Sequence, residues 1–381
     1  MINNKEYQKY NSFNEIQFKK KVNKENLLSQ IKNCLYNDNN GELSNYQKKI
    51  LERVKKDLFH ESSKEKFKLS NHVFNEINQI EEKDIPKYLF HRYRYEVFPK
   101  NFEKDDYPPF LQIEPSSICN YRCVFCFETD PTFSGKKSGF MGTMSLDLFK
   151  SIIDQAENKV EFISIASRGE PFVNNEIPKM LEYTSGKFLS LKINTNASLL
   201  NEKKIHAILS GGVTTIVFSA DAADSELYAK LRVNGKLEKV LKNIELFNKI
   251  KETKYKNSKI ISRVSGVKVG ENQKIEDMYN LWGQLVDQVA FVNYNPWENV
   301  YNKEERKINL PCSDLWRRMF IWWDGKINPC DTDYKSLLSV SNFKEKSLRD
   351  AWNSKEYDDY REKHLNDNRN KIYPCKNCVL V

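Results

Sequence analysis

No apolar run in the 381-residue chain approaches the about 20 residues that a membrane-spanning helix needs. The first residues, MINNKEYQKYNSFNEIQFKKK, are polar and lack the apolar core of a secretory signal. These two absences predict a cytoplasmic protein without a membrane span. Disulfides are uncommon in that compartment, so closely spaced cysteines there favour metal or redox chemistry.

Long basic runs are missing as well, although the formal net charge is +9. The positive excess is spread along the chain instead of forming a patch, so nucleic acid is not an expected partner. The five histidines are scattered too, and none is assigned a role. Hydrophobic residues make up 39% of the chain, which is enough for a globular core.

The first hundred residues predict helices and little else. Residues 1–25 are polar and expected to be loosely ordered, and helical patterns follow in 26–37, 44–59 and 72–98, the last broken near Pro86. Cys34 falls on the apolar face of the first pattern and is expected to be a small core residue.

From Pro108 onward, short β-rich runs alternate with helical runs. The expected strands are 110–115, 160–166, 190–196, 214–221, 259–267 and 288–295. The expected helices are 146–157, 176–185, 201–210, 225–250 and 273–285, the first capped by Ser145. Six such units predict a parallel sheet, either a partial barrel or an open doubly wound sheet, with its chemistry at the C-terminal strand ends.

Seven of the eight cysteines form two sets. The stretch EPSSICNYRCVFCFE (114–128), directly after the first expected strand, holds Cys119, Cys123 and Cys126. The tail holds the second set, which is Cys312, Cys330, Cys375 and Cys378. An Asp324-Gly325 pair between two β-like runs predicts a hairpin that would bring Cys312 and Cys330 towards each other.

Each set fits a different kind of metal site. Four thiolates can hold zinc or a 4Fe–4S cluster. Three thiolates can ligate three irons of a cubane, which leaves the fourth iron open. Zinc stays an alternative for both sets, and for the tail in particular, because a hairpin followed by Cys-x2-Cys is also typical of zinc ribbons.

The Cys119-x3-Cys123-x2-Cys126 spacing, with aromatic Phe125, resembles the signature of radical S-adenosylmethionine (SAM) enzymes. Further segments over roughly 108–300 match in the expected order: Ser167-Arg168-Gly169-Glu170-Pro171, INTNASLL (193–200) and FSADAADSELYAKLR (218–232). Arg168 and Ala197 stand where the family has glycine.

The resemblance implies a partial (β/α)6 barrel of the radical SAM type with a SAM-binding 4Fe–4S cluster on the three cysteines. It implies that Phe125 packs on the adenine, and it assigns SAM contacts to Glu170 (amino group), Asn194, Ser219 (ribose) and Arg232 (carboxylate). It also implies a 5′-deoxyadenosyl radical that abstracts hydrogen from substrate. The electron would come from an external reductant such as flavodoxin or ferredoxin.

The tail resembles the auxiliary-cluster domain called SPASM, in its shortened "twitch" form. Its four cysteines suffice for one fully ligated auxiliary 4Fe–4S cluster. The expected organisation is therefore a helical region (1–107), the barrel (108–304) and a small hairpin-plus-helix cluster domain (305–381).

A fully ligated auxiliary cluster is suited to take an electron from a substrate radical. We therefore expect a dehydrogenase that acts on a sugar, an aminocyclitol or a similar small molecule. Asp331 and Asp333 are weak candidates for the proton acceptor, and a solvated turn fits both of them better. The alternatives are a peptide-modifying maturase, a sugar epimerase, for which Cys34 is poorly placed, and a zinc-stapled binding protein without catalysis.

Overall fold

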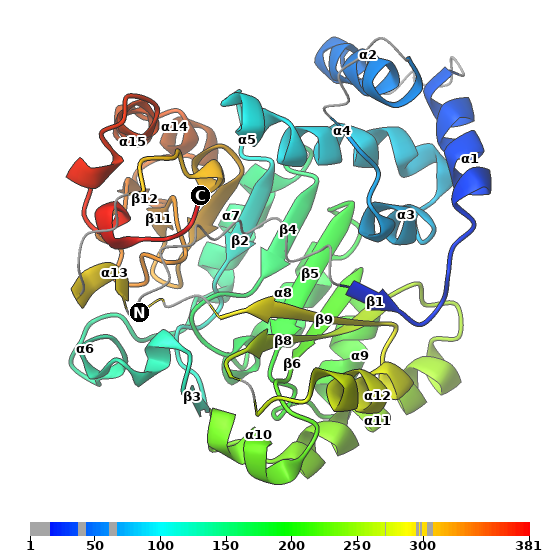
Figure 1. Cartoon of the computed structure of the whole chain (residues 1–381), viewed down its shortest axis with the longest axis vertical. Coiled ribbons are helices and arrows are strands. Elements are labelled where there is room, and N and C mark those ends of the chain that lie inside the picture. Colours follow the sequence, from blue (N-terminus) through cyan, green and yellow to red (C-terminus); the bar gives the residue numbers. More distant parts are fainter. Residues whose placement is uncertain are drawn as a thin grey trace.

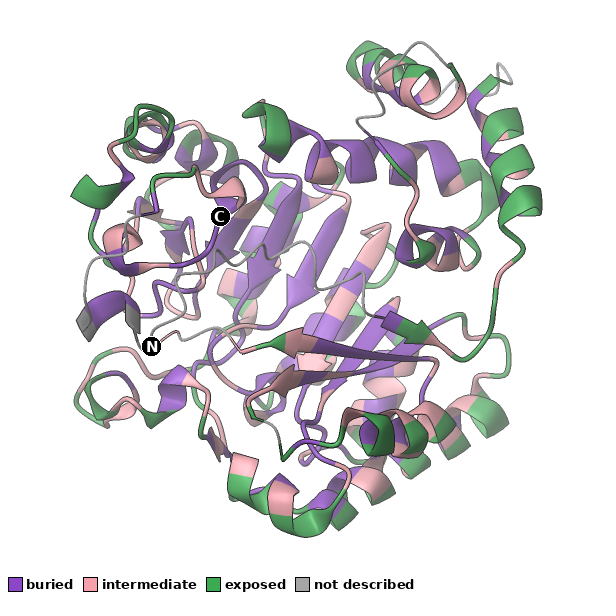
Figure 2. Ribbon diagram, viewed as in Figure 1, coloured by how far each residue is buried: buried purple, intermediate pink, exposed green. Residues whose placement is uncertain are grey.

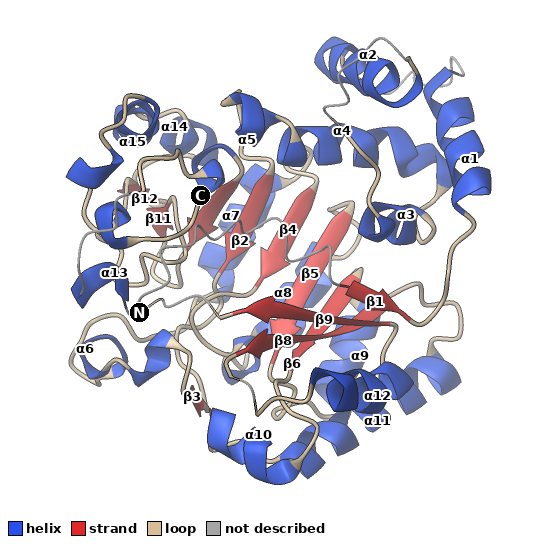
Figure 3. Ribbon diagram, viewed as in Figure 1, coloured by secondary structure: helices blue, strands red, loops and turns tan. Residues whose placement is uncertain are grey.

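The computed structural model describes residues 16–36, 43–60, 67–270, 272–294, 297, 299–302 and 308–381. One ten-stranded sheet runs through the protein (Figure 3). Its strands are β1 (Ile16–Phe18), β2 (Phe110–Ile113), β4 (Phe162–Ile165), β5 (Ser190–Thr195), β6 (Thr215–Ser219), β8 (Ile261–Lys268), β9 (Gln288–Asn293), β10 (Arg318–Ile321), β11 (Lys326–Asn328) and β12 (Ser341–Asn342).

The strand order, β1-β9-β8-β6-β5-β4-β2-β10-β11-β12, decides between the two expected folds. From β2 to β9 the six central strands are neighbours in chain order, and every pair is parallel. A doubly wound sheet would reverse its strand order at a switch point. The partial (β/α)6 barrel is therefore confirmed.

Five helices cover the outer face of the barrel: α7 (Leu146–Ala156), α8 (Ile177–Thr184), α9 (Glu202–Ser210), α11 (Leu237–Lys254) and α12 (Ile275–Leu285). They pack side by side in chain order. Ser145 caps α7 as predicted, because its side chain accepts a hydrogen bond from the backbone N–H of Leu148. The apolar core lies between these helices and the sheet (Figure 2).

The helix expected over 225–250 is in fact two helices. After α10 (Ser225–Leu231) the chain forms a short strand, β7 (Arg232–Val233), before α11 begins. Asn234 takes a left-handed conformation with φ 72° just beyond this strand, so the helix cannot continue there. In β7, Arg232 pairs directly with Cys123 of β3 (Arg122–Cys123), so this break brings Arg232 to the cysteine loop.

The N-terminal region consists mainly of helices, as expected: α1 (Lys24–Tyr36), α2 (Asn45–Phe59), α3 (Asn71–Ile77), α4 (Ile85–Glu96) and α5 (Phe98–Asn101). Their apolar core includes Phe110 and Phe162, the first residues of β2 and β4. The helices therefore cover the N-terminal ends of these strands (Figure 1).

One expectation for this region was wrong. Residues 16–18, within the stretch expected to be loosely ordered, form β1, which pairs antiparallel with β9. Ile16 is buried there, and this tertiary contact orders a segment too short to signal a strand by itself. Residues 1–15 lie outside the described part of the chain.

The predicted hairpin is present in the C-terminal part. β10 and β11 pair antiparallel, and Gly325 takes a φ of 89° in the turn. However, β10 also pairs parallel with β2 over four residues, so the sheet runs across the expected boundary at 304/305. The domain boundaries remain a prediction.

Three helices complete the C-terminal part: α13 (Asn299–Asn302), α14 (Leu348–Trp352) and α15 (Lys355–Leu365). Across the described residues, no helix has the length and apolar character that crossing a membrane requires.

Candidate active site

The three clustered cysteines lie beyond the C-terminal end of β2, where a barrel places its site. Cys119, Cys123 and Cys126 line one cavity of about 350 Å3. Burial raises the pKa of all three thiols, that of Cys126 to about 12. Burial thus favours the neutral thiols, and a bound cation would favour the thiolates.

The predicted SAM contacts Phe125, Glu170, Asn194, Ser219 and Arg232 line the same cavity. They come from the cysteine loop and from the C-terminal ends of β4, β5 and β6, and from β7. The structure thus brings together every residue of the first cysteine set and of the expected SAM set. Their individual roles stay predictions.

Glu170 joins the turn after β4 to the turn after β5. Its Oε1 accepts from the Thr195 hydroxyl at 2.7 Å and from the Phe172 N–H, and its Oε2 accepts from the Asn196 N–H at 2.7 Å. A carboxylate has about four acceptor positions, so one remains for a ligand such as an ammonium group. Burial raises the pKa of Glu170, while these hydrogen bonds favour its charged form.

Some residues that line this cavity carry buried polar atoms without a hydrogen-bond partner among the described residues. The Ser167 Oγ and the Asn194 Oδ1 are two such atoms, and both are inaccessible to solvent. Buried polar groups are normally hydrogen-bonded, so these two atoms fit a polar ligand. The cavity thus suits SAM, which carries hydroxyl, amino and carboxylate groups.

Arg232 has two protein partners in the site. Its Nε lies 2.5 Å from Oδ2 of Asp221, and its Nη1 donates to the sulfur of Cys123 at 3.8 Å. Its guanidinium also lies over the Phe125 ring, 5.7 Å from the centroid. Sequence reasoning missed Asp221, because an acidic residue in a turn after a strand has no signal that sets it apart from Asp224 nearby.

Glu128, two residues after Cys126, is a second residue that sequence reasoning missed. It is buried, both its oxygens lack a hydrogen-bond partner within the part of the chain that the structure describes, and Arg122 lies 3.3 Å away as its ion-pair partner. Burial raises the pKa of Glu128 to about 8. The cysteine loop therefore carries a carboxyl group that is protonated more often than an exposed glutamate.

The four tail cysteines gather around a separate cavity. Cys312, Cys330, Cys375 and Cys378 all line it, together with apolar Leu315. Among the described residues, no three His, Cys, Asp or Glu side chains are placed to share one metal ion. Each cysteine set instead surrounds a cavity, an arrangement that suits a cluster, in which each thiolate binds a different iron.

The two weak proton-acceptor candidates lie on this side of the molecule. Asp333 lines the tail cavity, and its two oxygens accept from the Tyr301 hydroxyl and from the backbone N–H groups of Leu337 and Leu338. These contacts hold a turn, which favours a structural role for Asp333. Asp331 is half-buried and lines neither cavity.

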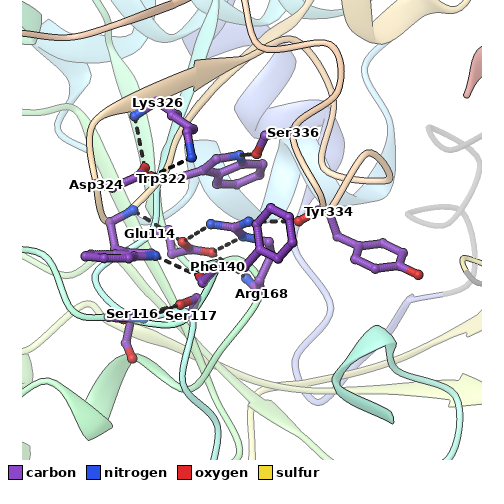
Figure 4. A network of polar contacts seen from close by, with 12 residues as sticks. Glu114, Ser116, Ser117, Phe140, Arg168, Trp322, Asp324, Lys326, Tyr334 and Ser336 are labelled. Carbon is purple, nitrogen blue, oxygen red and sulfur yellow. Dashed lines mark hydrogen bonds and ion pairs between the residues drawn. The ribbon is translucent and has the colours of Figure 1, made fainter. Parts of the chain in front are cut away.

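Arg168 links the cavity that the predicted SAM contacts line (the SAM cavity) to the C-terminal part (Figure 4). Its guanidinium donates to both oxygens of Glu114, at 2.6 and 2.7 Å, and to the backbone oxygen of Tyr334 at 2.8 Å. It also lies 4.2 Å from the centroid of the Trp322 ring. The arginine that replaces a family glycine therefore fastens the segment after Cys330 to the end of β2.

The same segment contacts the cysteine loop directly. The Tyr334 ring stacks on Phe127, which follows Cys126, with 4.9 Å between centroids. The Tyr334 hydroxyl donates to Asp130, the N-cap of α6 (Pro131–Ser134). Because Asp333 next to it lines the tail cavity, residues 330–334 connect the two cysteine sites.

Fold and sites together define an iron–sulfur protein built on an open parallel barrel. The family model of the radical SAM superfamily matches residues 113–267, and that of the SPASM iron–sulfur cluster-binding domain matches residues 312–379. The chain belongs to the radical SAM superfamily, and its C-terminal part is a SPASM-type domain. Its cofactors are accordingly a SAM-binding 4Fe–4S cluster, an auxiliary 4Fe–4S cluster and SAM.

Two relatives illustrate the range of the family. The tungsten-containing aldehyde ferredoxin oxidoreductase cofactor-modifying protein of Pyrococcus furiosus is 24% identical over 320 residues, which cover 71% of this chain and 87% of the relative. The GTP 3′,8-cyclase of Clostridium botulinum is 25% identical over 247 residues, which cover 62% of this chain and 70% of the relative.

Solved structures share the fold. The structure of anSMEcpe with bound AdoMet has a TM-score of 0.52 at 17% identity, covering 71% of this chain and 88% of that one. Streptococcus suis SuiB bound to its precursor peptide SuiA has a TM-score of 0.51 at 18% identity, covering 73% and 72%. At these identities the likeness concerns the fold alone.

Proposed function

We propose that this radical SAM enzyme dehydrogenates a carbon that bears oxygen or nitrogen in a small molecule of the sugar or aminocyclitol type. When bound and reduced, the cluster and SAM supply a 5′-deoxyadenosyl radical that abstracts hydrogen from substrate. An external one-electron reductant such as flavodoxin or ferredoxin provides the electron. The names of the relatives point to different substrates, so they do not indicate which reaction this enzyme catalyses.

The observation that carries this proposal is the four-thiol cavity beside the active site. Cys312, Cys330, Cys375 and Cys378 can give an auxiliary cluster all its ligands, so no iron is left open for substrate. Such a cluster suits electron transfer. Because residues 330–334 join this cavity to the cysteine loop, it has a short route to the site where a substrate would lose an electron.

The rest of the cavity lining serves binding and the exclusion of water. Phe127, Val292 and Trp297 form apolar walls around the SAM set. The two arginines among the lining residues, Arg168 and Arg232, are each paired with a buried carboxylate. Because both arginines are already paired, this lining favours an uncharged or amine-bearing substrate over an anionic one.

A deuterium-transfer assay tests the proposal. The anaerobically loaded enzyme, SAM and a chemical reductant are incubated with aminocyclitols and sugars that carry deuterium at single carbinol or amine-bearing carbons. We expect deuterium in 5′-deoxyadenosine and a ketone or imine-derived product from at least one compound. Deuterium transfer with a product of inverted configuration, and no oxidised product, would instead identify an epimerase.

The structure disfavours the two enzymatic alternatives. Cys34, the one cysteine outside the two sets, lies in α1 against Glu82, among helices at the opposite end of the barrel from the SAM cavity. It is therefore badly placed to return a hydrogen atom to substrate in an epimerase. Peptide maturases often carry a leader-binding winged-helix module, which needs strands of its own, and within the described N-terminal residues β1 pairs with the barrel strand β9.

A further inference from the structure

Arg232 makes two buried contacts that its expected role, binding the SAM carboxylate, does not explain. Its Nε pairs with Asp221 at 2.5 Å, and its Nη1 donates to the sulfur of Cys123 at 3.8 Å. Arg232 is 6% exposed and Asp221 is 0% exposed. Solvent therefore screens both interactions only weakly, and the contact of Nη1 with Cys123 acts directly on a cluster ligand.

The backbone fixes this arrangement on both sides. Cys123 and Arg232 are opposite each other in the antiparallel β3–β7 pair. Asp221 is held at the end of β6 because its Oδ1 accepts from the backbone N–H of Val267 at 2.6 Å. The guanidinium is thus clamped between a fixed carboxylate and a fixed cysteine before any ligand arrives.

The chemistry of guanidinium permits two tasks at once. It carries five N–H donors, of which one on Nη1 donates to Cys123 while Nε faces Asp221 in the ion pair, so others remain for a SAM carboxylate. We propose that Arg232, oriented by Asp221, is a positioning residue that holds the Cys123 thiolate and sets the reduction potential of the SAM-binding cluster in the absence of SAM. This inference concerns the cluster and is independent of the substrate proposed above.

The two residues act on that potential in opposite directions. Hydrogen bonds to ligand sulfurs and nearby positive charge stabilise the reduced, more negative cluster and raise its potential. Arg232 therefore raises the potential. Asp221 adds negative charge near the cluster, which disfavours reduction and lowers the potential.

A redox titration followed by electron paramagnetic resonance tests the proposal on the full chain, loaded with both clusters and free of SAM. The catalytic cluster is recognised by the signal that later addition of SAM changes. We expect Arg232→Met to shift its potential to more negative values by at least the tenfold change in equilibrium that equals about 59 mV for one electron. Asp221→Asn, which removes the negative charge and keeps the shape of the side chain, shifts it to more positive values.

Two further variants make the result specific. Lys230→Met removes a cation two residues away that is exposed and paired with Glu226, and we expect no shift. Arg232→Lys keeps the charge without the forked donor, and its potential should lie between those of wild type and Arg232→Met. It also serves as the test if Arg232→Met does not load iron.

Wild-type potentials in the loaded Arg232 variants, with only SAM affinity reduced, would overturn the proposal and leave Arg232 as a SAM contact alone. A shift of the same sign in Arg232→Met and Asp221→Asn would also overturn it. Because no substrate is present, neither result depends on which molecule the enzyme oxidises.

Discussion

Arg168 stands where the family resemblance has glycine, and its guanidinium is buried between Glu114 and the ring of Trp322. Removing one partner of a buried ion pair leaves an uncompensated charge, which costs about 3–5 kcal/mol. We therefore expect Arg168→Met to lower the free energy of unfolding by about that amount. Urea unfolding of the loaded protein, followed by tryptophan fluorescence, measures the loss.

The double variant Glu114→Gln/Arg168→Met should recover part of this loss. The glutamine amide carries no charge, and its single oxygen can accept from one of the two backbone N–H groups, those of residues 168 and 323, that donate to different oxygens of Glu114 now. Lys187→Met, which breaks a partly exposed pair with Glu157, is the matched control and should cost much less than Arg168→Met. Equal losses in the single and double variants would contradict the buried-charge argument.

Cys34 differs from the other seven cysteines in lying outside both sites. Burial and the neighbouring Glu82 raise the pKa of its thiol to about 11. The thiolate is the reactive form, and its fraction at pH 8 falls about tenfold for each unit by which the pKa rises. We therefore expect iodoacetamide to modify Cys34 on the order of a hundred times more slowly at pH 8 than an unperturbed thiol, with the rate rising up to about pH 11.

Glu82→Gln removes the negative charge that helps to raise this pKa, so it should speed the modification of Cys34 at pH 8. Peptide mapping by mass spectrometry follows the rate. Cys34→Ser should leave cleavage of SAM and turnover unchanged. Loss of turnover in Cys34→Ser would restore the epimerase alternative.

At the scale of elements, the turn after β4 and the cysteine loop are in backbone contact through Gly169. A Cβ atom there would lie 2.5 Å from the backbone oxygen of Ser116 and 2.6 Å from that of Ile118. Glu170 N–H also donates to the Ile118 oxygen at 3.0 Å. The loop that leads into Cys119 therefore packs directly against Gly169, because no side chain would fit between the backbone of this loop and that of the turn after β4.

We expect Gly169→Ala to push this loop away and to remove the SAM-binding cluster while the auxiliary cluster stays. Iron per chain should fall from about eight to about four, the content of one cluster. Iron and sulfide analysis after anaerobic loading measures the change. Gly283→Ala, at a helical position where a Cβ meets no atom within 4 Å, is the control and should keep its iron. Full iron content in Gly169→Ala would refute the argument.

Local pattern sufficed for most strands and helices of the barrel. The run expected over 214–221 is β6, and that expected over 190–196 is β5, because the β-rich runs signal strands from sequence alone. The break between α10 and α11 also had a signal, the Asn234-Gly235 pair, which helical periodicity on both sides concealed. That break matters for the site, since it brings Arg232 to Cys123.

Contacts between segments that are far apart in the sequence could not be predicted from local pattern. The pairing of Asp221 with Arg232 depends on two turns meeting, and β10 joins β2 across about two hundred residues of chain. The motif resemblance supplied residue types and their order, and the fold supplied their convergence on one cavity. Glu128 and Tyr334 were not among the motif residues, so the sequence did not indicate them as part of the site.

At the scale of the whole molecule, the auxiliary region is part of the barrel sheet. Arg318 to Ile321 of β10 pair in register with the four residues of β2, and Met319, Phe320 and Ile321 are buried. A chain cut after residue 304 would expose the β2 edge, which leads directly to the cysteine loop. Exposed edges and apolar strand surface promote aggregation.

We therefore expect residues 1–304 alone to be poorly soluble and unable to keep the SAM-binding cluster. A second protein distinguishes the loss of β10 from the loss of the auxiliary cluster. It is the full chain with Cys312, Cys330, Cys375 and Cys378 all changed to serine. It retains β10 and should stay soluble with about four irons, because the β2–β10 pairing and the Arg168 link are intact. Size-exclusion chromatography shows whether each protein is monomeric or aggregated, and iron analysis shows how many irons it holds. If the truncated chain is monomeric and holds about four irons, the barrel folds independently of β10, and the boundary at 304/305 separates two autonomous units.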